Sequence, residues 1–496
     1  MHPNVNGFRQ RLWRWHFFAG LIICPFLILI SITGSIYLFK AELEQWEERG
    51  INAISKQNAA ITTKKAEPIG EATLLQNVIA EYPAATFLRL TLAKQGDSTV
   101  EFDILPKEIM DHPEGGSEHA HHNAPNTEKL TIWVDRYSGK ILEVKVSEDR
   151  FLNIVKKLHS ELLLGNTASY IVELVASWAI VLLTSGSILW FYKSHSSKQR
   201  MEVKPSKQIF SPQLKINGRF NLRTVHAVIG LYISIPLMLM LLTGLPWTQL
   251  WGNGFKELKE FAGWSGPKQE WFVTLKSGDG LDRNLGNNLG NKFGKPELPE
   301  DTLWEISDNR KGMVSQSWGS NDQFAYTLTD IASKLEVLTL AHPIYISPPK
   351  SNNGVWTVRS MPPDRAKRVT LHFDQFSAQQ ISRIGFEDHH PVQRVVSHGI
   401  SLHEGALFGT LNKVLVLITA LSTTILCILG LMTWLKRRSA NSLGIPRKVN
   451  QDLPTKWLII ILLLCLFLPA FGVCIIVLAS LQFIYNSISN REQRSF

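Results

Sequence analysis

The chain has 496 residues, of which 45% are hydrophobic and only 19% are charged, and its net charge is +10. A soluble protein of this length would have nearer a quarter of its residues charged. Long apolar runs alternate here with long polar stretches, which excludes a single soluble globule, a disordered chain and a small disulfide scaffold.

Five apolar runs are long enough to cross a bilayer, which takes about 20 residues. The first is predicted to be a retained anchor, because its apolar core is too long for a signal peptide and no small-x-small cleavage site follows it. All the cysteines lie in these runs, outside any CxxC or CxxCH motif, which argues against a thiolate zinc site, an iron–sulfur cluster and covalently attached haem. The runs are 15–39, 168–192, 222–247, 411–435 and 457–485.

Basic residues predict the direction of these spans. Arg9, Arg11 and Arg14 precede the first span, and the loops 193–221 and 436–456 have a large excess of lysine and arginine. Positive loops stay on the cytoplasmic side, so these three segments are expected inside. The long polar segments, about 40–167 and 248–410, then lie outside. A fifth span would leave the tail 487–496 outside, although its arginines mildly oppose that.

Both outside segments are predicted to be α+β domains, over residues 40–150 and 248–393. They flank the segments 151–192 and 394–435, each of which combines a histidine near the outer surface with a span. In the first domain we expect a helix over 71–82, strands over 87–92, 99–105 and 129–133, and a hairpin turn into 141–146. In the second we expect a less regular stretch over 252–326, a helix over 327–338, and strands over 356–359 and 369–373.

The spans contain an internal repeat. In spans one and three a histidine is followed by glycine four residues later and by Thr-Gly at seventeen and eighteen, with a proline mid-span. Near spans two and four, Leu-His is followed by glycine six residues after the histidine. The chain therefore reads as two copies of span–outside domain–span plus a fifth span, and such duplications usually place a functional site between the halves. The histidines are His16, His226, His159 and His403.

The predicted topology sorts the four histidines into two pairs. His16 and His226 fall at the inner ends of their spans, and His159 and His403 at the outer ends. A polar side chain at membrane depth costs about 2 kcal/mol or more without a partner. A neutral imidazole is a good axial ligand for haem iron, and bundle cores hold such sites. We therefore predict an inner and an outer haem b in a mostly α, four-helix membrane core.

Glycines support this prediction. Gly20 and Gly230, one turn beyond His16 and His226, leave room for a flat macrocycle. His159 lies nine residues before its span, so a break at Gly165-Asn166 is expected to bring it back to the membrane surface, and Gly409 is expected to do the same for His403.

Several further residues have two readings. Arg14 and Arg394 are candidates for pairing with haem propionates, or are ordinary surface and orientation charges. His398 is a rival to His403 as the outer ligand. A histidine-rich stretch captures a metal transiently or is a solvated loop; its residues are His112, His119, His121 and His122.

These residues resemble a known family, the PepSY-associated transmembrane proteins, which are iron-regulated bacterial inner-membrane proteins that include ferric-siderophore reductases. The resemblance covers most of residues 8–437. It departs at Ala378, where the PepSY turn usually has glycine. The matching motifs are Arg14-x-His16-x3-Gly20, Leu158-His159-x5-Gly165, Val134-Asp135-Arg136-Tyr137-Ser138-Gly139-Lys140, Val225-His226-x3-Gly230 and Leu402-His403-Glu404-Gly405-x3-Gly409.

The resemblance implies two b-type haems, two periplasmic PepSY domains, and electron transfer from inside to a ferric chelate outside, with His159 and His403 nearest the acceptor. Reducing Fe(III) to the softer Fe(II) weakens the grip of oxygen ligands. An outward electron is favoured by about 2.3 kcal/mol per 100 mV. The inner loops are too short for a flavin or nicotinamide domain, so a separate protein or membrane quinol is the expected donor.

Two functions other than ferric-chelate reduction are also compatible with the sequence. One is a haem-free PepSY membrane protein that binds or regulates an outside partner such as a protease. The other is a transporter built on the repeat, which is weaker because ion coupling needs an acidic residue mid-span and none was identified. A nucleic-acid partner is not expected, because the positive charge is a property of membrane orientation.

Overall fold

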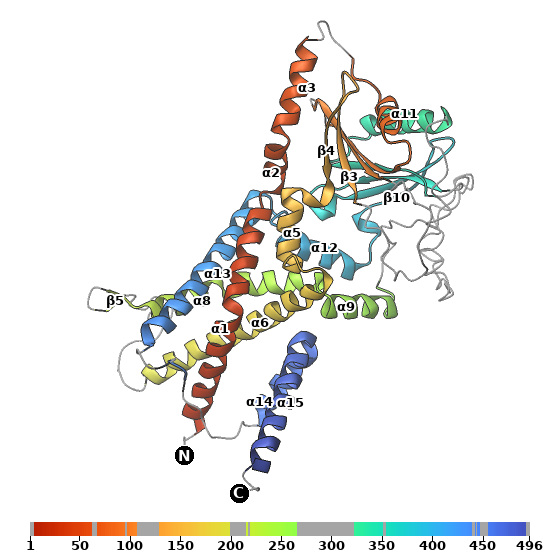
Figure 1. Ribbon diagram of the computed structural model, residues 1–496. Helices are drawn as coiled ribbons and strands as arrows, with labels where there is room; N and C mark the ends of the chain where they lie inside the picture. The colour runs from red at the N-terminus through yellow and green to blue at the C-terminus, as the bar shows by residue number, and fades with distance from the viewer. Residues whose placement is uncertain are drawn as a thin grey trace, which may run out of the picture. The chain divides into compact units, whose positions relative to one another are not determined.

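In a computed structural model the chain forms two compact units (Figure 1). The first combines 1–40, 154–264 and 395–496, and the second combines 41–153 and 265–394. The described residues are 4–61, 67–94, 97–106, 128–198, 215–216, 219–264, 322–350, 354–438, 442, 444–446 and 455–492.

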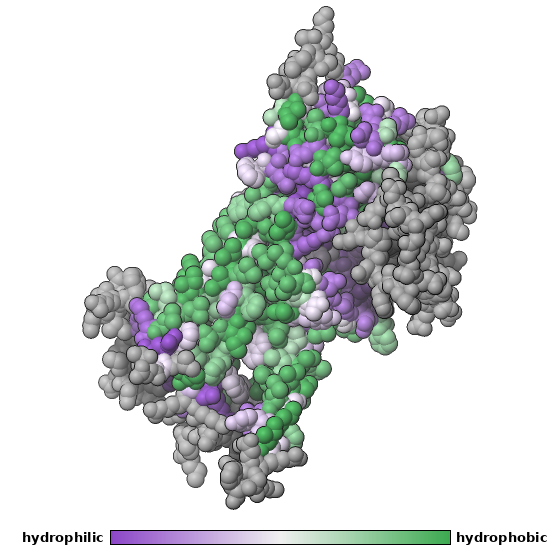
Figure 2. Space-filling model, viewed as in Figure 1, coloured by the Kyte–Doolittle hydropathy of each residue, from purple (hydrophilic) through white to green (hydrophobic). Residues whose placement is uncertain are grey.

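The first unit is built on four long apolar helices. These are α1 (Asn4–Tyr37), α6 (Asn166–Lys198), α8 (Leu222–Gly244) and α13 (Thr410–Arg437). Helices α1 and α8 each pack against both α6 and α13, so α1 and α8 lie diagonally across the bundle. The visible face of this unit is mainly hydrophobic (Figure 2). Five helices in the described part of the chain are long and apolar enough to cross a membrane, and the protein is a multi-pass membrane protein.

Short helices precede two of the spans, at the breaks that the sequence predicts. Helix α5 (Phe151–Glu161) is separated from α6 by a turn in which Leu162, Leu163 and Gly165 have positive φ angles. Helix α12 (Pro391–His403) is separated from α13 by a turn with positive φ at Gly405 and Gly409. Glycine tolerates this left-handed backbone, whereas Leu162 and Leu163 adopt it at a cost in strain. Each short helix thus ends before the span begins.

The predicted span over 457–485 is two helices, α14 (Thr455–Phe467) and α15 (Pro469–Glu492). They lie against each other, and a Cβ on Gly472 would come within 2.8 Å of the Cys465 carbonyl oxygen. Residues equally far before and after the Leu468–Pro469 turn are therefore in contact, so the chain reverses there. The expectation that the tail lies outside rested on a single crossing and no longer follows.

The turn of this hairpin is anchored to the bundle. Leu468 and Phe471 are buried with Ile180 of α6 and Leu245, which belongs to a short 3-10 turn (Leu245–Trp247) after α8. At the other end of α14, Trp457 stacks on Phe8 of α1 with ring centroids 4.1 Å apart. Helix α9 (Leu250–Phe261) also contacts α15, and a small two-stranded ladder, β5 (Lys215–Ile216) with β6 (Arg219–Phe220), precedes α8.

The second unit contains one eight-stranded antiparallel sheet in the order β10-β9-β8-β7-β1-β2-β3-β4. Strands from both predicted outside domains share it, because β1 pairs with β7, with Leu90 opposite Ile346. The predicted strands over 87–92, 99–105, 129–133, 141–146, 356–359 and 369–373 are all present. The strands are β1 (Thr86–Leu92), β2 (Thr99–Leu105), β3 (Leu130–Asp135), β4 (Ile141–Val146), β7 (Ile344–Ser347), β8 (Val355–Ser360), β9 (Val369–Asp374) and β10 (Gln380–Ile384).

One face of the sheet makes the core of this unit. Helices α4 (Glu71–Glu81) and α11 (Asp322–Val337), both predicted, contact each other and bury Leu74, Leu328 and Ile331 with Phe102 and Trp356. Strand alternation places the apolar residues of β2 and β8 on this face. The remaining elements are α2 (Lys40–Glu47), α3 (Arg49–Ile61) and three 3-10 turns, Ser147–Asp149, Arg365–Lys367 and Phe386–Asp388.

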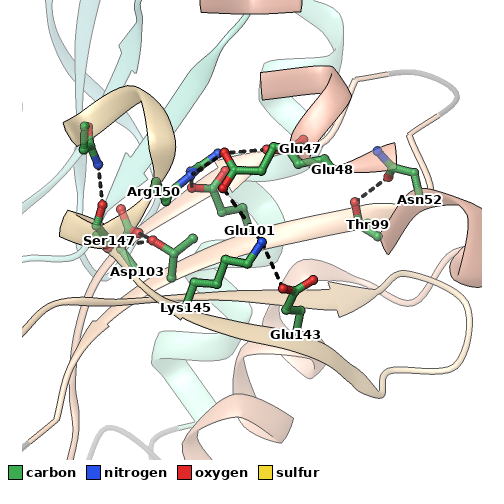
Figure 3. Close-up of polar contacts among 12 residues, drawn as sticks. Glu47, Glu48, Asn52, Thr99, Glu101, Asp103, Glu143, Lys145, Ser147 and Arg150 are labelled. Carbon is green, nitrogen blue, oxygen red and sulfur yellow. Dashed lines mark hydrogen bonds and ion pairs between the residues drawn. The ribbon is translucent and has the colours of Figure 1, made fainter. Parts of the chain in front are cut away.

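An ion-pair cluster ties α2 and the residue after it to the sheet (Figure 3). The Arg150 guanidinium lies 3.0 Å from Glu48, 3.3 Å from Glu101 of β2 and 3.8 Å from Glu47. Burial raises the pKa of Glu48 to about 7, with a further contribution from the charge of Glu101. Arg150 immediately precedes α5, so this cluster fixes the chain where that helix begins.

Candidate functional site

His16 and His226 lie on the diagonal helices α1 and α8, and they are electrostatic neighbours. The His16 Nδ1 is 2.9 Å from the Ser185 hydroxyl of α6. That hydroxyl donates its own hydrogen to the Leu182 carbonyl at 3.1 Å, so it accepts a hydrogen from His16. The His226 Nδ1 donates to the Leu426 carbonyl of α13 at 3.0 Å. The bundle thus brings together the predicted inner pair.

His159 and His403 form a second pair of electrostatic neighbours, on α5 and α12. The His159 Nδ1 donates to the Ile30 carbonyl of α1 at 3.0 Å and lies 3.1 Å from the Thr33 hydroxyl. The two short helices therefore place their histidines against the long ones.

His403 repeats this arrangement on α8. Its Nδ1 donates to the Met240 carbonyl at 2.9 Å and lies 3.3 Å from the Thr243 hydroxyl. Burial lowers the pKa of His159 to about 4, and burial also lowers the pKa of His403. Both outer imidazoles are therefore neutral at physiological pH, which leaves each ring with a lone pair.

Each of the four rings rests on a glycine of the neighbouring helix. A Cβ on Gly34 or Gly186 would lie 3.1 Å from the Cε1 of His159 or His16 respectively. The corresponding distances are 3.2 Å for Gly244 beside His403 and 3.4 Å for Gly430 beside His226. Most real Cβ atoms do not approach this closely, so the glycines create the notches in which the rings sit.

The sequence contained the signal for all four notches. Gly34 and Gly244 belong to the repeated Thr-Gly pairs already recognised. Gly186 and Gly430 follow His159 and His403 by the same interval of 27 residues, a further element of the repeat that was missed. The repeat spacing therefore extends to residues that contact the histidines of the other pair.

Gly20 and Gly230 do not contact the histidine rings through their Cα positions. An added Cβ would meet Leu182 at 3.9 Å from Gly20, and Leu426 at 3.5 Å from Gly230. These are ordinary van der Waals distances, so neither glycine is required by the packing of the protein chain alone.

The two predicted arginines have protein partners in the structure. Arg14 donates to the Pro446 carbonyl at 2.8 Å and lies over the Phe18 ring. Arg394 pairs with Glu387 at 2.6 Å. His398 lies five residues before His403, about 140° around α12, and the charge that acts on His159 is that of His403. The stretch with His112, His119, His121 and His122 is outside the described residues.

Two buried polar residues were missed, one beside the site and one at α9. Asn412, buried in α13, donates to the Leu402 carbonyl at 3.1 Å and accepts from the Leu407 amide, so it clamps the turn after His403. Glu173 is an acidic residue within α6. Its two carboxylate oxygens accept hydrogen bonds from the Leu250 and Trp251 amides. Glu173 therefore has a capping role at α9.

The four histidines share one chemical state. Each Nδ1 is engaged as a donor, and in the described part of the chain none of the four Nε2 atoms makes a hydrogen bond. A histidine held in this way presents Nε2 as a metal ligand in a fixed orientation. Within the same residues no group of three or more histidine, cysteine or acidic side chains is placed to hold a metal ion. A pair of histidine ligands suits haem iron, because the porphyrin already supplies the other four ligands of the metal.

Comparison with known proteins gives the family. No curated protein matches the chain. The model of the PepSY-associated TM region matches residues 13–437, which include both histidine pairs and all eight strands of the sheet. The chain belongs to the PepSY-associated transmembrane family.

Proposed function

We propose that this protein is a dihaem b-type oxidoreductase of the bacterial inner membrane that reduces a periplasmic ferric chelate, namely a ferric siderophore. In this proposal His16 and His226 hold the inner haem, and His159 and His403 hold the outer one. The observation that carries it is the shared state of the four imidazoles, in which Nδ1 is donated to a neighbouring helix and Nε2 is left for a ligand.

The residues of the chain have defined tasks in this function. The carbonyls of Ile30, Met240 and Leu426 and the Ser185 hydroxyl hold the rings in one tautomer. Hydrogen bonds of this kind also raise the basicity of a histidine ligand. The glycine notches set the ring positions. When bound, the two haems would supply one-electron redox centres near opposite faces of the membrane.

The span between the two pairs suits electron transfer across a bilayer. His16 and Gly34 are 18 residues apart on α1, and Gly34 meets His159. This is about 27 Å of helix, close to the thickness of the hydrocarbon core. The acceptor would be reduced near His159 and His403, and the donor would be quinol or a separate protein on the inner side.

A spectrum tests the proposal. Protein purified in detergent after expression with ample haem should show reducible b-type Soret and α bands, and about two haems per chain. His16→Ala and His403→Ala should each lose one haem, because each removes one ligand of a different pair. Reduction of an external Fe(III) chelate should stop in His403→Ala, and His398→Ala serves as the matched control on the same helix.

Three outcomes contradict the proposal in different places. A colourless wild-type protein would favour the haem-free regulator of a periplasmic partner. If His403→Ala kept two haems and His398→Ala kept only one, His398 and not His403 would be the ligand of the outer haem. Two haems with no reduction of any ferric chelate would leave the cofactors in place and refute the substrate class.

A further inference from the structure

Two arginines lie at the end of the bundle where α8 begins and α13 ends. Arg223 is in the first turn of α8, and Arg437 is the last residue of α13. Neither arginine forms an ion pair with a carboxylate among the described residues. The charge of Arg223 acts on Arg437, so the two side chains are near enough to repel each other. Helices α8 and α13 pack against each other, so their ends place two like charges at one end of the bundle, and an anion there would relieve the repulsion between them.

Arg437 is held in place by aromatic rings. Its guanidinium lies 4.7 Å from the centroid of the Trp13 ring and 5.2 Å from that of Phe17, both on α1. It also donates to the Gly444 carbonyl. An arginine fixed by stacking loses less freedom on binding an anion than a solvated one, and its remaining N–H groups suit a carboxylate.

Both arginines are placed on the side of the inner histidine pair. Arg223 precedes His226 by three residues, which is nearly one helical turn. Arg437 follows Gly430, the notch for the His226 ring, by seven residues. Seven residues are about two turns, so the two positions share a face of α13 at a separation of about 10 Å.

We propose that Arg223 and Arg437 form an anion site that binds the propionate carboxylates of the inner haem. The inference rests on the proposed function, and it transfers to this pair the role considered for Arg14. Arg14 and Arg437 each donate to a backbone carbonyl and lie against an aromatic ring, so the second positive charge, that of Arg223, is what distinguishes Arg437. The pair would also orient the haem, with its carboxylates toward the end of the bundle where α1 and α8 begin.

The test compares haem retention in the full-length protein. Wild type, Arg223→Gln, Arg437→Gln and the double variant are mixed with an excess of a haem-scavenging protein, and loss of the inner haem is followed by absorbance. A His16→Ala protein identifies which spectral component is the inner haem. Arg438→Gln is the matched control, because Arg438 is the next residue and stacks on Trp434 instead.

We expect the double variant to lose the inner haem about tenfold faster or more, since hydrogen bonds between arginine and a carboxylate are stronger than neutral ones. Arg437→Lys should recover part of the loss. Protein loaded with haem dimethyl ester, which has no propionate charge, should lose it at the same rate in wild type and variant.

Two results would overturn the anion site while leaving the proposed function intact. One is an inner haem that is retained equally by the double variant and by Arg438→Gln. The other is an unchanged haem with a fall in co-purifying anionic phospholipid, which would make a lipid phosphate the occupant. A wild-type protein without haem would instead refute the proposed function.

Discussion

Replacing Gly34 with alanine isolates one notch of the site. The new Cβ would lie 3.1 Å from His159 Cε1 and 3.5 Å from Nδ1, so the ring must move by a few tenths of an ångström. That ring is fixed by a 3.0 Å bond to the Ile30 carbonyl and a 3.1 Å contact with Thr33, both on the same helix as the new methyl group. The ring is pushed away from its own hydrogen-bond partners.

The expected cost is weaker binding of the proposed outer haem. Disturbing the hydrogen bond behind a metal-binding histidine typically lowers affinity by about 10- to 100-fold, or about 1.4–2.8 kcal/mol. Alanine favours a helix over glycine by about 1 kcal/mol, so the variant should not unfold α1. A loss of haem is then assigned to the ring and not to the fold.

Haem transfer to a scavenging protein measures this effect. Gly34→Ala should lose its outer haem at least tenfold faster than wild type, with the inner haem unchanged. Gly50→Ala is the control, because a Cβ there meets nothing within 4 Å. Equal retention of the outer haem in Gly34→Ala and Gly50→Ala would show that the notch does not orient His159.

Three further predictions test other parts of the molecule. Asn412→Ala should release the turn after His403 and speed loss of the outer haem only, measured by the same transfer assay; an effect on both haems would refute a local role. Gly20→Ala fits the protein chain, so loss of the inner haem in this variant would reveal contact with the macrocycle, and full retention would exclude it. The pKa of Glu48 is raised by burial from about 4.5 to about 7, so the stability it contributes is present below pH 4.5 and is lost as pH rises through 7. Thermal unfolding of Glu48→Gln should therefore depend less on pH in this range than that of wild type, and parallel curves would contradict this.

The helices and strands could be predicted because each depends on the pattern of residues within its own segment. Apolar runs gave the long helices, and alternation gave strands such as β2 and β9. The histidine pairs were predicted because the repeat and the charge rule together placed His16 beside His226 and His159 beside His403. The joining of the two outside segments was not predictable, because the pairing of Leu90 with Ile346 is non-local and no periodicity encodes it.

Proline shows why the hairpin was missed. Pro25 and Pro236 lie inside α1 and α8 without ending them, whereas Pro469 follows a reversal of the chain. The sequence signal is the same in all three cases, because proline removes the same backbone donor. The outcome differs through packing: Leu468 and Phe471 are buried at the turn, and Gly472 lets the two helices approach.

The reversal at Leu468 also changes how the protein can be labelled. Because α14 starts beside Phe8 and the chain then turns back, a reporter fused after α15 should share a compartment with one fused before α1. The two arginines of the tail then obey the charge rule that a fifth crossing would have violated. Affinity tags and fluorescent fusions at both termini would then lie on the same side of the membrane and leave the opposite side unobstructed.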